Sequence, residues 1–135
     1  MKPSLAAGVE ATTQLTVDRP RTIDFMGEKA RVYATPMLLR DIEMASRQLI
    51  LQHLDAGEDT VGTRVELDHL GATLMGMTVE ITVRIVEVNG RAVTLEFSAK
   101  DNIEPITKGR HQRFVVDVAK TEQRLAAKAA KAGLV

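Results

Sequence analysis

The stretch TPMLLRDIEMASRQLILQHL at residues 35–54 carries a long helical pattern, and the rest of the chain must pack around it. Thr35 and Pro36 are typical of a helix start. A threonine side chain at the N-cap can accept a hydrogen bond from a backbone N–H. Proline suits the first helical position, because a backbone N–H there would have no partner within the helix. At about 100° per residue, the apolar side chains form one broad stripe. We therefore predict a helix at residues 36–54 with one buried face. The stripe contains Leu38, Leu39, Ile42, Ala45, Leu49 and Ile50.

Runs of alternating apolar and polar residues predict strands on both sides of this helix. A short Thr-rich run precedes it, and Pro20 prevents that strand from continuing. Residues 21–33 show no sustained period, which is typical of a connecting loop, and this loop could act as a lid. The expected strands lie at residues 12–17, 60–69, 77–85, 91–100 and 106–119, with Asn89-Gly90 as a tight hairpin between the third and fourth.

The order of these elements, one strand, one helix and then four strands, predicts an α+β fold. We expect the four later strands to form an antiparallel meander, and the sheet to wrap around the lone long helix and bury it. This is the pattern of the hot-dog fold. We expect a single domain over residues 1–135, with its core at about residues 12–119. Residues 120–135 are rich in Ala and Lys and predict a solvated helix or a frayed end.

Composition argues against several classes of function. The chain has 135 residues, of which 44% are hydrophobic and 27% charged, as in a soluble single-domain protein. Eighteen basic residues balance eighteen acidic ones, which disfavours a nucleic-acid partner. The absence of cysteine excludes disulfides, thiol nucleophiles and Cys-ligated metals. Three separated histidines lack metal-ligand spacing, and no apolar run reaches the roughly 18 residues of a membrane span. We expect a cytoplasmic protein with neither a metal nor a membrane partner.

His69 breaks the apolar pattern of its strand. It shares the predicted inward face with Val61, Thr63, Val65 and Leu67. A buried imidazole needs a hydrogen-bond partner, so His69 is either a core histidine bonded to a carbonyl or a functional group.

Thr35 and Glu43 are two further candidates, each with a structural alternative. Thr35 could serve only as the N-cap, and Glu43 could form an ordinary i,i+4 ion pair with Arg47. Glu43 lies about two turns, roughly 12 Å, beyond Thr35 along the helix. A central strand packed over the helix could place His69 between the hydroxyl and the carboxylate, and these three groups together can activate a nucleophile or a water for acyl transfer.

At these residues the chain resembles the fluoroacetyl-CoA thioesterases and their relatives in the hot-dog thioesterase superfamily. The likeness extends over residues 32–119, with a weaker start at residue 17. The matching residues are Ala34, Thr35, Glu43, Gly62, Thr63, His69, Ala72, Thr73, Gly76, Gly90, Arg91, Ala99, Asp101, Ile106, Gly109, His111 and Arg113.

This resemblance implies roles for four residues. Thr35, Glu43 and His69 correspond to the catalytic set of the family, and Gly62 corresponds to the glycine whose backbone amide lies near the thioester carbonyl. The resemblance also implies a homodimer, or a higher oligomer of dimers, with active sites at the subunit interface. No cofactor is expected, because coenzyme A enters as part of the acyl-CoA substrate.

Lys108, Arg110 and Arg113 form the densest basic stretch of the chain. They could bind the phosphates of coenzyme A through charge-assisted hydrogen bonds. The alternative is a solvated edge strand whose charges prevent aggregation.

The expected function is hydrolysis of an acyl-CoA thioester with a short acyl chain. The family member that handles fluoroacetate has a longer, phenylalanine-bearing lid, whereas residues 21–33 here offer only Phe25 and Tyr33. The main alternative is a non-catalytic acyl-CoA binding or regulatory module on the same fold. A hot-dog hydratase is disfavoured, because Asp68 and His69 are adjacent in a strand and point to opposite faces.

Overall fold

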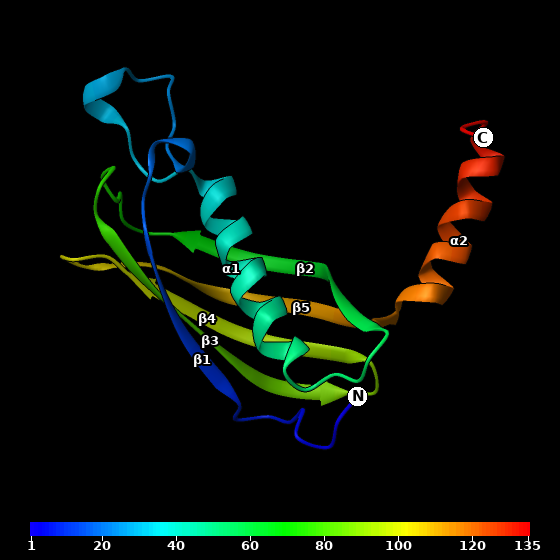
Figure 1. Ribbon diagram of the computed structural model, residues 1–135. Helices are drawn as coiled ribbons and strands as arrows, with labels where there is room; N and C mark the ends of the chain where they lie inside the picture. Colours follow the sequence, from blue (N-terminus) through cyan, green and yellow to red (C-terminus); the bar gives the residue numbers. More distant parts are fainter.

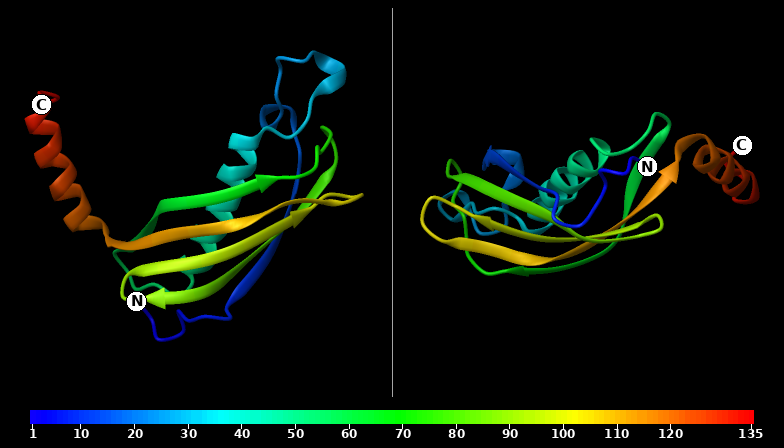
Figure 2. Two further views of the ribbon diagram at one scale, coloured as in Figure 1. Left: turned by 180° about the vertical axis from the view of Figure 1, so that it is seen from behind. Right: turned by 90° about the horizontal axis from the view of Figure 1, so that it is seen from below.

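A five-stranded antiparallel sheet packs against the long helix α1 in the computed structural model, which describes residues 1–135 (Figure 1). The helices are α1 (Thr35–Leu51) and α2 (Val118–Lys131), and two short 3-10 turns lie at Arg19–Arg21 and Glu28–Ala30. The strands are β1 (Glu10–Thr16), β2 (Glu58–His69), β3 (Thr78–Asn89), β4 (Ala92–Lys100) and β5 (Pro105–Asp117). Figure 2 shows the sheet curving around α1 while α2 projects from the end of β5. The predicted α+β arrangement is confirmed.

Alternation along most of β3 and β4 buries one face of each strand. Ile81 and Leu95 point inward and are fully buried with Leu38 and Ile42 of α1. The opposite face of the sheet is polar and carries side chains such as Lys100. The sheet therefore has one face covered by α1 and one largely solvated face.

The strand order β1-β3-β4-β5-β2 corrects the predicted meander. β3, β4 and β5 do follow one another, but β2 pairs with β5 at the edge of the sheet and has no contact in the ladder with β3. Residues 70–77 carry the chain from β2 past the ends of β5 and β4, which a tight hairpin could not do. One edge of β2 is consequently unpaired, and the strand that carries His69 is an edge strand rather than a central one.

A β-bulge directly after Gly62 changes which residues of β2 face the helix. The extra residue reverses the alternation, as bulges do. Val61 and Thr63, both predicted to point inward, are exposed, and Thr60 is buried instead. Beyond the bulge the strand alternates as predicted and leaves His69 partly buried.

The start of α1 also differs from the prediction. Ala34 occupies the N-cap without any side-chain hydrogen bond, and Thr35 is the first helical residue. The prediction that Thr35 caps the helix is therefore wrong, and its hydroxyl is available for another partner. At the other end of the chain, α2 has no buried residue, which confirms the predicted solvated helix. Neither helix is long and apolar enough to cross a membrane.

Candidate active site

The hydroxyl of Thr35 lies 2.7 Å from Nδ1 of His69. Thr35 stands in the first turn of α1 and His69 is the last residue of β2. The pair was predicted from sequence, and the structure brings it together because the edge strand β2 ends beside the beginning of the helix. A hydroxyl and an imidazole at this distance can share or transfer a proton.

A cavity of about 300 Å³ opens beside this pair. Most of its lining is apolar and comes from the loop that precedes α1 and from the turn that follows β2. The lining residues are Ile23, Phe25, Val32, Tyr33, Thr35, His69, Leu70, Gly71 and Ala72. The loop at residues 21–33, predicted as a possible lid, thus forms one wall of the cavity.

A buried carboxylate ties this loop to α1. Asp41, on the second turn of the helix, accepts hydrogen bonds from Nε of Arg21 at 2.9 Å and from the Tyr33 hydroxyl. Burial, together with the hydrogen bond to Asp41, raises the pKa of Tyr33, so the phenol stays protonated and continues to donate. Both ends of the lid are therefore anchored, while Phe25 near its tip is 78% exposed.

His69 is held in its neutral form by its surroundings. Burial lowers its pKa below the ordinary histidine value, and a backbone group at Gly71 opposes this in part. Its Nε2 atom is buried and has no hydrogen-bond partner within the chain. A neutral imidazole that accepts a hydrogen bond from Thr35 can act as a general base.

Glu43 lies in a second group, away from Thr35 and His69. Its Oε2 is 3.5 Å from Nη1 of Arg113. A Cβ built on Gly62 would lie 3.2 Å from the same oxygen, so Gly62 also belongs to this group. Along α1 the two groups are about 12 Å apart, and along β2 about 23 Å apart, from the rise per residue of helix and strand. One chain therefore contains the four predicted residues in two separate places.

The sequence-based alternative for Glu43 is wrong. Arg47 makes a bidentate pair with Asp59, with its Nε at 2.9 Å and its Nη2 at 2.7 Å from the two carboxylate oxygens. Glu43 pairs with Arg113 instead, and the Glu43 side chain is 37% exposed.

The three basic residues of β5 do not share a surface. Lys108 and Arg110 are on the outer face of the sheet, where Arg110 lies 3.6 Å from Glu96. Arg113 has the opposite orientation in the strand, and its side chain is only 3% exposed. The expectation that Arg113 meets a coenzyme A phosphate at the surface is corrected by this burial. The same role for Lys108 and Arg110 stays a prediction.

Sequence reasoning gave His111 no role, although it is 2% exposed and lies within the second group. A signal was present, because His111 and Arg113 occupy alternate positions of a strand and so point to the same face. Two polar side chains facing a core is unusual.

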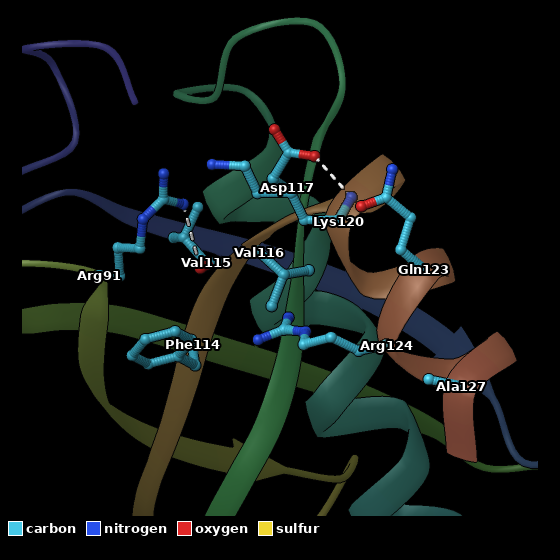
Figure 3. A pocket seen from close by; sticks show the side chains of 9 residues that line it. All are labelled: Arg91, Phe114, Val115, Val116, Asp117, Lys120, Gln123, Arg124 and Ala127. Carbon is cyan, nitrogen blue, oxygen red and sulfur yellow. Dashed lines mark hydrogen bonds between the residues drawn. The ribbon is translucent and has the colours of Figure 1, made fainter. Parts of the chain in front are cut away.

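A further cavity, of about 590 Å³, lies between β5 and α2 and is open along the helix (Figure 3). It is lined by apolar side chains including Phe114 and Val116 and by the basic side chains of Arg91, Lys120 and Arg124. None of the predicted catalytic residues borders it. No group of three or more His, Asp or Glu side chains in the chain is placed to hold a metal ion.

Comparisons with known proteins identify relatives of this chain. A family model described as fluoroacetyl-CoA-specific thioesterase matches residues 17–119. The fluoroacetyl-CoA thioesterase of Streptantibioticus cattleyicolor is 28% identical over an alignment 127 residues long, which covers 89% of this chain and 91% of that protein.

Solved structures support the same relationship. A Thermus thermophilus protein described as a thioesterase superfamily member superimposes with a TM-score of 0.89 at 28% identity over the whole of both chains. A crystal structure of a fluoroacetyl-CoA thioesterase gives a TM-score of 0.85 at 26% identity, covering 93% of this chain and 98% of the other. These neighbours confirm the predicted hot-dog fold. Since the family model spans most of the chain and includes both residue groups, the protein belongs to the fluoroacetyl-CoA-specific thioesterase family and is a thioester hydrolase.

Proposed function

We propose that this protein hydrolyses a short-chain acyl-CoA to the free acid and coenzyme A, with Thr35, His69 and Glu43 as its catalytic residues. The observation that carries the proposal is the 2.7 Å contact between the Thr35 hydroxyl and His69 at the wall of an apolar cavity of about 300 Å³. A cavity of this size has room for a short acyl group.

The role of Glu43 follows from the tautomer that catalysis needs. If Thr35 donates its proton to Nδ1, neutral His69 carries its own proton on Nε2. That N–H requires an acceptor, and Nε2 has none within the chain. A carboxylate at this position would hold the ring in the required tautomer and stabilise the imidazolium formed during the reaction.

A homodimer would bring Glu43 to His69. β2 has an unpaired edge, and two copies of an edge strand can pair antiparallel about a two-fold axis. With the axis between Val65 and Glu66, residue 62 of one chain lies opposite residue 69 of the other. Each active site would then combine Thr35 and His69 of one chain with Gly62 and Glu43 of the partner subunit, and the Gly62 N–H could donate to the thioester oxygen.

Two routes use these groups. In the first, Thr35 Oγ attacks the thioester carbonyl, its proton passes to His69, and the departing thiolate of coenzyme A takes that proton. Water then hydrolyses the acyl-threonine by the reverse transfers. In the second, the carboxylate or His69 removes a proton from water, and the water oxygen attacks the carbonyl directly while Thr35 hydrogen-bonds to the substrate. The C–S bond then breaks, and the departing thiolate of coenzyme A takes the proton. A burst of thiol release equal to the enzyme concentration distinguishes the first route.

The test is thiol release from a panel of acyl-CoA thioesters of increasing chain length. We expect the parent to prefer short chains, and His69→Ala to lower kcat/KM by about 10² or more, as expected for a lost general base. His53→Ala is the matched control, because the only hydrogen bond of the His53 side chain is to Ser4, away from the site, and the variant should retain parental activity. Binding of acyl-CoA without any hydrolysis by the parent would instead favour the non-catalytic binding module.

A further inference from the structure

His111 and Arg113 form a buried polar chain that leads to Glu43. Nδ1 of His111 lies 2.8 Å from the backbone carbonyl of Arg64, and its Nε2 lies 3.2 Å from Nη1 of Arg113. The same Nη1 is 3.5 Å from Oε2 of Glu43. The far side of the guanidinium donates to Thr60, from Nη2 to the carbonyl at 2.8 Å and from Nε to the hydroxyl at 3.3 Å.

The partners of His111 allow one tautomer only. The carbonyl of Arg64 can only accept, so Nδ1 carries the proton, and the guanidinium can only donate, so Nε2 carries a lone pair. Both requirements are met by the neutral ring protonated on Nδ1. Burial and the Arg113 charge lower the pKa of His111, while the Arg64 carbonyl and Glu43 act in the opposite direction.

The β-bulge supplies the first link of this chain. It sits between Gly62 and Arg64 and disturbs the ladder at the point where the Arg64 carbonyl meets His111. The backbone of Gly62 packs closely against this group, since a Cβ at Gly62 would lie 3.2 Å from Cε1 of His111 and 3.4 Å from Nη1 of Arg113. Every side of the guanidinium is thus occupied by a partner or by close packing.

We propose that His111 is a positioning residue for thioester hydrolysis, which holds the Arg113 guanidinium against the Glu43 carboxylate and so fixes the direction in which that carboxylate points. This inference rests on the proposed catalytic role of Glu43. Without the acceptor on His111, the guanidinium would keep its two bonds to Thr60, but Nη1 beside Glu43 would lose a buried acceptor and could shift within the site. A displacement of about 1 Å in a catalytic group can cost on the order of 10² in rate.

Two amide substitutions at His111 test which of its two hydrogen bonds matters for catalysis. Glutamine reaches the place of Nε2 and can accept from Arg113, whereas asparagine reaches only the place of Nδ1 and can donate to Arg64. We expect His111→Gln to stay within about threefold of the parental kcat, and His111→Asn to lose between about 10- and 100-fold in kcat with little change in KM. If the bond to the Arg64 carbonyl were the important one, the asparagine variant would be the more active, and the proposal would be overturned.

A double-mutant cycle tests the route through Glu43. In a Glu43→Gln background, His111→Asn should lower kcat by less than about threefold further, since residues acting through one another are not additive. A full additional loss would show that His111 acts elsewhere. Melting temperatures of all variants, with His53→Asn as a control, account for any loss of folded protein.

One readout does not depend on the reaction. ¹⁵N NMR of the parent should show His111 as the neutral ring protonated on Nδ1 at pH 7. A proton on Nε2 would overturn the proposal even in an active enzyme, because Arg113 could not then donate to the ring. If the parent hydrolyses no thioester, the proposed function fails, and the tautomer still reports whether the chain from Arg64 to Arg113 exists.

Discussion

Thr35 has a single hydroxyl, which could either cap the helix or bond to His69. Had Thr35 capped α1, its oxygen would accept a backbone N–H and its geometry would be set by the helix. Ala34 takes the N-cap position without a side-chain bond instead, and Thr35 turns to His69. A good N-cap is worth about 1 kcal/mol, so α1 gives up a modest stabilisation at the residue where the hydroxyl is used.

Gly62 is predicted to be intolerant of even one extra carbon. Gly62→Ala would place a Cβ 3.2 Å from Oε2 of Glu43 and 3.4 Å from Nη1 of Arg113, closer than most real contacts. We expect kcat to fall by about tenfold or more as the carboxylate moves, and the melting temperature to fall as well, because the added carbon also presses on the buried His111 ring. Steady-state kinetics and a thermal melt on one preparation measure both. A variant with parental kcat would contradict the prediction, because it would show that the Glu43 carboxylate tolerates the added carbon.

The buried His111 is predicted to make the fold less stable as the pH falls. Burial lowers its pKa below 6.5, so His111 protonates first in the unfolded chain. The unfolded state then binds more protons than the folded state, and the free energy of unfolding decreases from about pH 7 downward until the folded pKa of His111 is reached. Urea unfolding between about pH 7.5 and 5.5 measures this, and His111→Gln should reduce the slope. Equal stability across that range would contradict the prediction.

At the scale of elements, the lid at residues 21–33 is anchored at its ends but offers few side chains that could select between substrates. Its ends are fixed to α1 through Asp41, but its tip offers the cavity only Phe25, which is largely exposed. A single apolar contact separates two similar substrates by about 1–3 kcal/mol. We therefore predict that fluoroacetyl-CoA and acetyl-CoA have kcat/KM values within about 10² of each other. Competition between the two thioesters in one reaction gives the ratio directly, and a preference of about 10⁴ or more would show that another part of the cavity recognises fluorine.

The elements themselves could be predicted because their signals are local. Periodicity of 3.6 and of 2 located α1 and all five strands, and Asn89-Gly90 located the β3–β4 hairpin. The position of β2 at the edge of the sheet could not be predicted, since pairing with β5 is a contact between distant segments that leaves no local pattern. The bulge after Gly62 was missed for a related reason. Alternation continues through the sequence there, and only the ladder shows that one residue is extra.

At the scale of the whole molecule, the candidate residues could be named from the sequence, but their arrangement in space could not. The resemblance to a known family identified Thr35, Glu43, Gly62 and His69, but a sequence does not say which side chains meet within one copy. The structure joins Thr35 to His69 and keeps Glu43 with Gly62 in a second group. If the catalytic set is a unit, the free edge of β2 is where a second copy would complete it.

Mixed dimers test this arrangement without a structure of the complex. Thr35→Ala and Glu43→Gln should each abolish most activity as homodimers. In a mixed dimer, one site would combine the two damaged residues, and the other would combine an intact Thr35 with an intact Glu43 of the partner subunit. Random exchange of equal amounts makes about half of all dimers mixed, so activity should return to roughly a quarter of the parental value.

The control is the doubly substituted chain mixed with the parent. These mixed dimers contain no intact site if Thr35 and Glu43 act across the interface, but one intact site if they act within a single chain. The first case leaves about a quarter of the parental activity after complete exchange, and the second leaves about half. Recovery in the first mixture together with a quarter in the second requires a composite site. No recovery in the first mixture together with half in the second would place the whole catalytic set within one chain and remove Glu43 from the reach of the neighbouring His69.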